Sequence, residues 1–184
     1  MNNGMDFYRL RFEFIGEDET GKLITKKQED LVVAVNYTDA ETIALEIMND
    51  MAMTQFDDRV KYEIIKTKIS EIMLTNVFSI DEDFKRKYIL YYLTEGEEET
   101  GLFAVTVVYT EINDNDKRKK TKEDIYVAAA NPKEAYTFVQ KYLNHVETRD
   151  WVIRNVKFDK ASSVLITEDM HKSNTYKSES AGLL

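Results

Sequence analysis

The chain has 184 residues, a formal net charge of −9 at pH 7 and no cysteine. Without cysteine there is no disulfide, no thiolate nucleophile and no cysteine metal site, and a reducing compartment is the natural setting. The negative charge argues against indiscriminate binding of duplex DNA or anionic membranes, because a broad cationic surface supplies most of that affinity.

The composition predicts a folded protein, since 43% of the residues are hydrophobic and 11% are aromatic. The longest apolar runs are strand-sized, far short of the roughly 20 residues of a membrane span. The first five residues have no basic start and no hydrophobic stretch, so we expect no signal peptide. These features together predict a cytoplasmic protein without membrane contact.

The first half predicts the order strand, strand, helix, strand. Residues 7–14 alternate between apolar and charged side chains, as in a half-buried strand. A turn-rich segment at 16–21 leads to a second strand at 30–35. Thr38 stands three residues before a glutamate, the spacing of a capping box, so a helix should begin there. In the extended stretch 60–74 the alternation slips, as at a bulge or a strand break.

An insertion follows. Residues 79–84 have the pattern of a short capped helical turn, and residues 87–93 have that of a strand. The acidic turn at 95–101 should fold this strand back onto the strand at 102–109 as a hairpin.

The second half repeats the order of the first. A turn at 113–116 joins the strand at 102–109 to a strand at 124–129. Asn131 is the predicted cap of the next helix, with proline at its first position. An extended stretch at 151–166 slips in phase as its counterpart does, and a polar tail at 169–184 should be flexible.

The two halves carry one matching hexapeptide, EDLVVA at 29–34 and EDIYVA at 123–128, an offset of 94 residues. We therefore predict an α+β fold, a tandem duplication of a strand-strand-helix-strand unit with mostly antiparallel sheets and an inserted β-hairpin between the repeats. We expect the two repeats to pack on each other about a pseudo-twofold axis. The predicted boundaries are 5–78 for the first repeat, 79–101 for the linker and inserted strand, 102–168 for the second repeat and 169–184 for the tail.

Catalytic signatures are missing from the sequence. There is no H-E-x-x-H, no phosphate-binding glycine loop and no nucleophile elbow. His145 falls near a predicted helix end, where it would favour the helix dipole, and His171 falls in the tail. The segments 81–83 and 113–116 carry several oxygen ligands but lack the spacing of the helix-loop-helix calcium site. We therefore expect no enzyme, no cofactor and no metal site.

Three clusters of basic residues occur in this chain despite its negative net charge. Lysines on two protruding hairpins could simply keep them soluble and discourage edge pairing. Alternatively, these clusters could contact phosphates while tyrosines provide stacking surfaces, as in proteins that hold single-stranded nucleic acid. The candidate residues are Lys22, Lys26 and Lys27 on the first hairpin arm, Lys117, Arg118, Lys119 and Lys120 on the second, and Lys85, Arg86, Lys87, Tyr91 and Tyr92 around the inserted strand.

Three segments carry a resemblance to a known family: 7–12 (FYRLRF), 30–41 with its TDAE cap, and 67–72 (TKISEI). They resemble an uncharacterised two-repeat family that occurs in Bacteroidetes and in the crAss-like phages that infect them. The resemblance is clearest over residues 7–74, and the inserted hairpin departs from it. It implies a bacterial or phage setting and brings no functional residues with it.

Three functions fit these observations. The leading hypothesis is a non-enzymatic binding protein of phage or bacterial DNA metabolism that contacts single-stranded nucleic acid through its basic arms. The first alternative is a structural or assembly protein, such as a virion or scaffold component, that binds other proteins or its own copies through sheet edges. The second is a host-directed inhibitor with an acidic surface. The bacterial cytoplasm, or a virion, would be the location.

Overall fold

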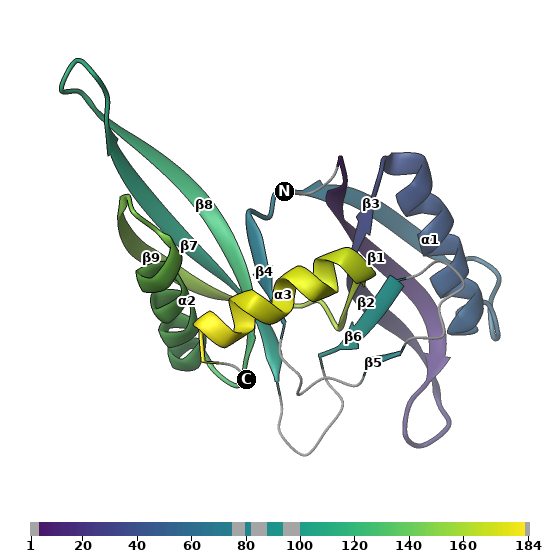
Figure 1. The fold of residues 1–184 in the computed structure, drawn as a ribbon. Helices are drawn as coiled ribbons and strands as arrows, with labels where there is room; N and C mark the ends of the chain where they lie inside the picture. The colour runs from purple at the N-terminus through teal and green to yellow at the C-terminus, as the bar shows by residue number, and fades with distance from the viewer. Residues whose placement is uncertain (1–3, 75–79, 82–87, 94–99, 183–184) are drawn as a thin grey trace. The chain divides into compact units, whose positions relative to one another are not determined.

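The computed structural model describes residues 4–74, 80–81, 88–93 and 100–182 (Figure 1). The chain forms two compact units, the first made of Met1–Lys68 with Ala161–Ile166 and the second of Ile69–Lys160 with Thr167–Leu184. Both units combine a sheet with helix, which confirms the predicted α+β class.

In the first unit, strands β3, β1, β2 and β10 lie side by side in that order, and helix α1 contacts β1, β2 and β3. β1 and β2 form a long antiparallel hairpin, and β3 pairs antiparallel with the other edge of β1. β10 pairs parallel with β2. The bounds are β1 (Asp6–Glu17), β2 (Leu23–Ala34), α1 (Tyr37–Asp50), β3 (Lys61–Thr67) and β10 (Ser163–Thr167).

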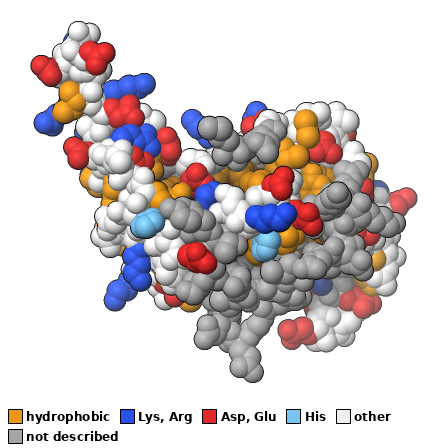
Figure 2. Space-filling model, in the orientation of Figure 1, with side chains coloured by type: hydrophobic (Ala, Val, Ile, Leu, Met, Phe, Trp, Pro, Cys, Tyr) orange, Lys and Arg blue, Asp and Glu red, His pale blue; other side chains and the backbone are white. Residues whose placement is uncertain are grey.

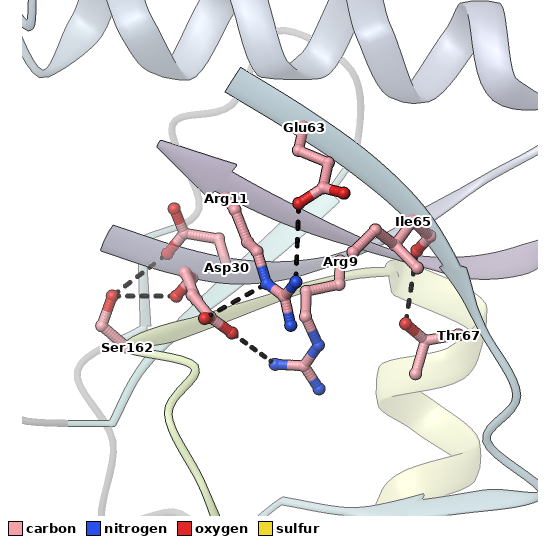
Figure 3. A network of polar contacts seen from close by, with 8 residues as sticks. Arg9, Arg11, Asp30, Glu63, Ile65, Thr67 and Ser162 are labelled. Atoms are coloured by element: carbon pink, nitrogen blue, oxygen red, sulfur yellow. Dashed lines mark hydrogen bonds and ion pairs between the residues drawn. The ribbon is translucent and has the colours of Figure 1, made fainter. Parts of the chain in front are cut away.

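Side chains alternate along β1 as predicted, with apolar residues on the core face and charged residues on the opposite face. Leu10 and Phe12 are 0% and 2% exposed, and their face packs against α1. Arg9 and Arg11 lie on the opposite face (Figure 3), where Arg9 Nη1 is 3.1 Å from an oxygen of Glu29 and Arg11 Nε is 3.2 Å from the other. The charged residues of β1 are therefore matched across the sheet.

In the second unit, β4, β8, β7 and β9 form a sheet in that order, and α2 packs on it. Its core brings together alternate residues of β7 and β8, among them Phe103, Val105 and Ile125, with Val139 and Leu143 of α2. β5 and β6 pair antiparallel. The bounds are β4 (Glu71–Met73), β5 (Ile80–Asp81), β6 (Tyr88–Tyr92), β7 (Gly101–Ile112), β8 (Arg118–Ala129), α2 (Pro132–Val146), β9 (Asp150–Asp159) and α3 (Glu168–Ser180).

The helix caps correct one prediction and confirm another. α1 begins after Asn36, whose side chain accepts a hydrogen bond from the Asp39 amide at 3.0 Å, so Thr38 is not the cap. α2 begins after Asn131, as predicted, and Asn131 accepts from the Glu134 amide at 2.9 Å. In both helices the acidic third residue accepts a hydrogen bond from the residue before the cap. The two caps are thus the same structure.

The true separation of the repeats is 95 residues, not 94. The β1–β2 hairpin pairs Asp6 with Ala34, and the β7–β8 hairpin pairs Gly101 with Ala129, so both partners are offset by 95 (101 − 6 and 129 − 34). The matching hexapeptides are therefore out of phase by one residue. Because side chains alternate along a strand, Asp30 is equivalent to Ile125 rather than to an aspartate.

The last strand of each repeat pairs with a strand of the other repeat. The predicted strand break is confirmed in both halves, since β3 and β4 are separate strands and so are β9 and β10. However, β4 pairs with β8 of the second unit, and β10 pairs with β2 of the first. Each unit is completed by a strand from the other repeat, so the predicted boundaries after 78 and before 102 do not divide the units.

Two further predictions are wrong. β6 pairs with β5 and not with β7, because β8 and β9 occupy the two edges of β7. The predicted flexible tail instead forms α3, capped by the Thr167 hydroxyl, which accepts from the Met170 amide at 3.2 Å. An ion pair between Lys177 and Glu71 and the buried side chain of Ala181 hold this polar helix to the second unit.

Candidate nucleic-acid interface

The β7–β8 hairpin, here called the second arm (109–122), extends beyond α2 and β9 (Figure 1). Its tip is a locked turn, in which Asn113 Oδ1 accepts from the amides of Asn115 and Lys117 at 3.1 and 2.8 Å. Asp116 adopts a φ of 55°, the left-handed conformation that such a turn requires. The turn fixes the register from which the basic residues of β8 follow.

Alternation along β8 places Arg118, Lys120 and Lys122 on the face opposite α2. Their cross-strand partners on β7 are Ile112, Thr110 and Val108. All three cations are exposed, and they lie about 6.8 Å apart along the strand. No ion pair to any of the three occurs among the described residues. We call this set the β8 cationic row; Figure 2 shows basic side chains along this hairpin and acidic ones toward its tip.

The α2-facing side of the second arm is charged differently. Arg149 Cζ lies 3.9 Å from the centre of the Tyr109 ring, and its guanidinium donates to Glu147 at 2.7 and 2.8 Å and to Glu111 at 3.3 Å. The hydrogen bonds from Arg149 lower the pKa of Glu147 to about 2. Burial raises the pKa of Tyr109 to about 12. The cations of this side are therefore already matched, and Lys119, on the same side, lies across from Glu111.

The first arm (14–27) has the same turn but no cationic row. Asp18 Oδ1 accepts from the amides of Thr20 and Lys22 at 2.8 and 3.0 Å, as Asn113 does in the second arm. Lys22 therefore lies in the turn, while Lys26 and Lys27 lie on opposite faces of β2. Lys27 Nζ is 3.6 Å from Glu13. The lysines of the first arm therefore do not form an exposed row on one strand face.

The equivalence of the arms explains this difference. At an offset of 95, Leu23, Thr25 and Lys27 of the first arm correspond to Arg118, Lys120 and Lys122. Only the last position is basic in both arms, and the first arm neutralises it with Glu13. In the turn, Lys22 is equivalent to Lys117. On the strands, Lys26 corresponds to Thr121 and Ile24 to Lys119, so the two arms share only part of their basic positions.

The aromatic candidates are not exposed platforms in the described residues. Tyr91 is 1% exposed, and its hydroxyl contacts His171 Nδ1 of α3, so it offers no free ring face. The side chain of Tyr92 and all of Lys85, Arg86 and Lys87 lie outside the described residues. Among the described residues, β6 contacts β5 and α3 rather than a strand of the second arm.

Sequence reasoning missed the apolar residues beside the row. Ile112 is 65% exposed, and Val152 of β9, which pairs with Val108, is 49% exposed. The same face also holds Asp150, which is paired to Thr110 on the strand edge away from Lys120. Ile112 could have been found from strand alternation, but the placement of β9 required the structure.

A second polar cluster lies under α1 in the first unit (Figure 3). Asp30 is 1% exposed and accepts hydrogen bonds from Gln28 Nε2 at 2.7 Å, Ser163 Oγ at 2.6 Å and Ser162 Oγ at 3.2 Å. Desolvation raises the pKa of this carboxyl despite these bonds. The cluster is buried and fully occupied by its own partners, so it holds a strand in place rather than a ligand.

Within the described part of the chain, no group of three or more His, Asp or Glu side chains could hold a metal ion. The Asn113 oxygen, one of the candidate ligands in the sequence, is engaged in the arm turn. None of the described helices is both long and apolar enough to span a membrane.

Comparison with known proteins identifies a family for the chain but no activity. Neither the curated proteins nor the solved structures contain a match to it. One family, described as "Domain of unknown function (DUF4494)", matches residues 6–167, from the first residue of β1 to the last residue of β10. The chain therefore belongs to the DUF4494 family.

Proposed function

We propose that this protein is a non-enzymatic binding protein that contacts the phosphate backbone of single-stranded nucleic acid through the β8 cationic row. The observation that carries the proposal is the presence of Arg118, Lys120 and Lys122 on one exposed strand face, without an ion-pair partner in the described residues. Unmatched cations keep their full charge available for phosphates.

The shape of the row favours a single strand over a duplex. It is one side chain wide, and its cations recur about every 6.8 Å along the strand, an interval close to that of phosphates in an extended nucleic acid chain. Binding to a duplex would bring a broad face of the protein close to many phosphates, and the net charge of −9 makes that electrostatically unfavourable. A narrow projecting arm keeps the contact away from most of the acidic surface.

The contact would be weak, salt-sensitive and indifferent to base sequence. Three phosphate contacts to a single strand give a slope of about −2 in a plot of log affinity against log salt. Stacking adds about 1–3 kcal/mol per base in other single-strand binders. Tyr126, the described aromatic residue of β8 on this face, is only 7% exposed and offers no stacking surface. The exposed Ile112 and Val152 offer only apolar contact. A role in DNA metabolism, in the bacterial or phage setting that the family resemblance implies, is part of the same proposal.

The test is fluorescence anisotropy with a labelled single-stranded oligonucleotide at low and moderate salt. Reversal of Arg118, Lys120 and Lys122 to Glu is expected to weaken binding at least about tenfold at low salt and to flatten the salt slope. Reversal of Lys22, Lys26 and Lys27 on the first arm changes the net charge equally and serves as the matched control. Equal effects of the two triple variants, or no salt-sensitive binding, would contradict the proposal.

An assembly role through sheet edges is the second candidate, and β3 favours it. β3 is the outermost strand of the first unit and pairs with β1 in an unbroken register. Its Lys61 and Lys66 point their charges back to Glu13 and Asp6, at 3.4 and 2.7 Å. Tyr62 of the same strand is 39% exposed. An edge with neutralised lysines is open to a further strand.

Light scattering distinguishes this candidate from the first. Replacement of Ile64, in the middle of β3, with proline is expected to abolish an oligomer that forms through β3. Replacement of Val156 of β9 with proline is the control. β9 already carries a bulge at Arg154 that discourages edge pairing. A monomer at all concentrations would exclude self-assembly through β3.

A further inference from the structure

Two serines anchor the exchanged strands in the same way. The Ser70 amide and hydroxyl donate to the Asp124 carbonyl at 3.0 and 2.8 Å, and those of Ser162 donate to the Glu29 carbonyl at 2.8 and 3.2 Å. Glu29 and Asp124 are equivalent at the offset of 95. β4 and β10 therefore enter the units in the same register, each beside the second strand of the other repeat.

The residue after each serine distinguishes the two exchanged strands. In the first unit Ser163 lies beside the buried Asp30 and donates to it at 2.6 Å. In the second unit Glu71 lies beside Ile125 and pairs with Lys177 of α3. If β4 returned to its own repeat in this register, Glu71 would lie against Asp30, two carboxylates in a site that excludes water. Like charges at such a distance are strongly unfavourable.

Asp30 thus selects the sequence of β10 and rejects that of β4, but it does not distinguish between copies of the chain. We propose that a second copy of this protein can complete the first unit with its own β10, forming a reciprocally exchanged dimer. Every β2–β10 contact of the monomer is reproduced in such a dimer, because the same residues meet in the same register. This is the condition under which domain swapping costs little.

The chain needs one hinge to make this exchange. β10 is held at both ends by segments of the second unit, β9 before it and α3 after it. The exchange therefore moves residues 1–68 onto the β10 of the other copy, and only the connection from β3 to β4 changes path. That connection, residues 68–70, is without helix or strand structure. The partner predicted by these contacts is a second copy of this chain.

Cysteine trapping tests the exchange, and the chain offers a clean background because it has no native cysteine. One copy carries Glu29→Cys and the other Ser162→Cys, a pair whose backbones are joined by a 2.8 Å hydrogen bond. Neighbouring strands at this spacing can meet the geometry of a disulfide. The two variants are mixed in denaturant, refolded over a range of concentrations, oxidised and resolved on a non-reducing gel.

We expect a covalent heterodimer whose ratio to monomer rises about tenfold for a tenfold rise in concentration while monomer predominates, as mass action requires. The chain that carries both cysteines is the geometric control and should close within itself at low concentration. Val32→Cys with Leu165→Cys, which are also paired, replaces the first pair if loss of Glu29 prevents folding.

The specificity of Asp30 has its own control. Ser163→Glu, added to the Ser162→Cys copy, recreates the β4 sequence opposite Asp30 and is expected to lower the heterodimer yield at least fivefold. Monomer alone at every concentration overturns the proposal. So does a gel dimer that persists after reduction of the disulfide, or a yield that Ser163→Glu leaves unchanged.

Discussion

The two units share their turns and helix caps but differ in the charge and burial of other equivalent residues. At equivalent turns and caps they agree closely: Asp18 and Asn113 lock the arm turns, and Asn36 and Asn131 cap the helices. At the positions between them they diverge, since a buried aspartate in the first unit is an isoleucine in the second. Residues that set backbone path are thus kept alike, whereas residues that set charge and burial differ.

The helix positions give the largest expected contrast between the units. Leu143 of α2 is 1% exposed, whereas its equivalent in α1, Met48, is only half-buried. Leu143→Ala should lower the free energy of unfolding by about 2–5 kcal/mol, and Met48→Ala should cost clearly less. Urea unfolding followed by circular dichroism measures both, and fluorescence of the single Trp151 reports on the second unit. Equal losses would mean that the two helices are packed alike.

The anchoring serines give the next contrast. Ser163→Ala leaves the buried Asp30 carboxyl with one fewer donor, so we expect a loss of about 1–3 kcal/mol. Ser70→Ala removes a half-buried bond to a carbonyl oxygen and should cost about 0.5–1.5 kcal/mol. Chemical unfolding of the two variants in parallel measures the difference. A larger loss for Ser70→Ala would show that the hydroxyl–carboxyl contact is dispensable.

The pH dependence of stability sharpens the contrast between Asp30 and Ile125. Desolvation raises the pKa of Asp30 above 3.8, so the folded state holds its proton more tightly than the unfolded chain does. Its contribution is full below about 3.8 and is lost as pH rises through the folded pKa. Asp30→Asn does not titrate, so its stability relative to the natural chain should increase from pH 4 to pH 7.

Unfolding curves at several pH values measure this change. Asp57→Asn is a control of opposite sign, because hydrogen bonds from Arg59 lower the pKa of Asp57 to about 2. The contribution of Asp57 is present above 3.8 and is lost as pH falls toward 2, so its replacement should matter least in acid. A flat difference for Asp30→Asn would show that burial does not disfavour the charged carboxyl.

The arm turns give the smallest expected effect. Asp116 and Gly21 are equivalent, and both have positive φ, 55° and 80°. Asp116→Gly copies the first turn into the second and should stabilise the arm by about 0.5 kcal/mol, because glycine adopts this conformation without strain. Thermal unfolding of the variant beside the natural chain measures the shift. Destabilisation would indicate that the Asp116 side chain contributes a contact that outweighs its strain.

Local patterns in the sequence were enough to predict much of the fold. Alternation identified β1 and its charged face, and the Asn131–Pro132 cap placed the start of α2. The phase slips within 60–74 and 151–166 predicted a bulge or a strand break in each half, and the structure has strand breaks there, at 68–70 and 160–162. These features depend on neighbours in the sequence, so the sequence expresses them directly.

The failures have a common cause in long-range contacts. The last residues of β2 (30–34) and of β8 (125–129) are buried on both faces, so a shift of one residue between 29–34 and 123–128 hardly changes the pattern and hides the true offset. The partner strands of β4 and β10 are far away in the chain. α3 is too polar to be predicted as a packed helix, since its hold depends on Lys177 meeting Glu71 and on Ala181 entering the core.

The candidate site was found in part. The sequence marked the basic residues, and strand alternation alone separates Arg118 and Lys120 from Lys119. Neutralisation of Lys27 by Glu13 depends on the hairpin register, and the burial of Tyr91 depends on α3. Both were therefore out of reach of sequence patterns.

The contact between Asp30 and Ser163 joins positions 133 residues apart. At the ribosome, with elongation of about 5–20 residues per second, the nascent first unit would wait on the order of 10 seconds before its last strand has even been synthesised. During that interval the free edge of β2 is open to other strands. A carboxylate at the centre of that edge would protect it, because an intruding apolar strand offers no donor to satisfy the charge.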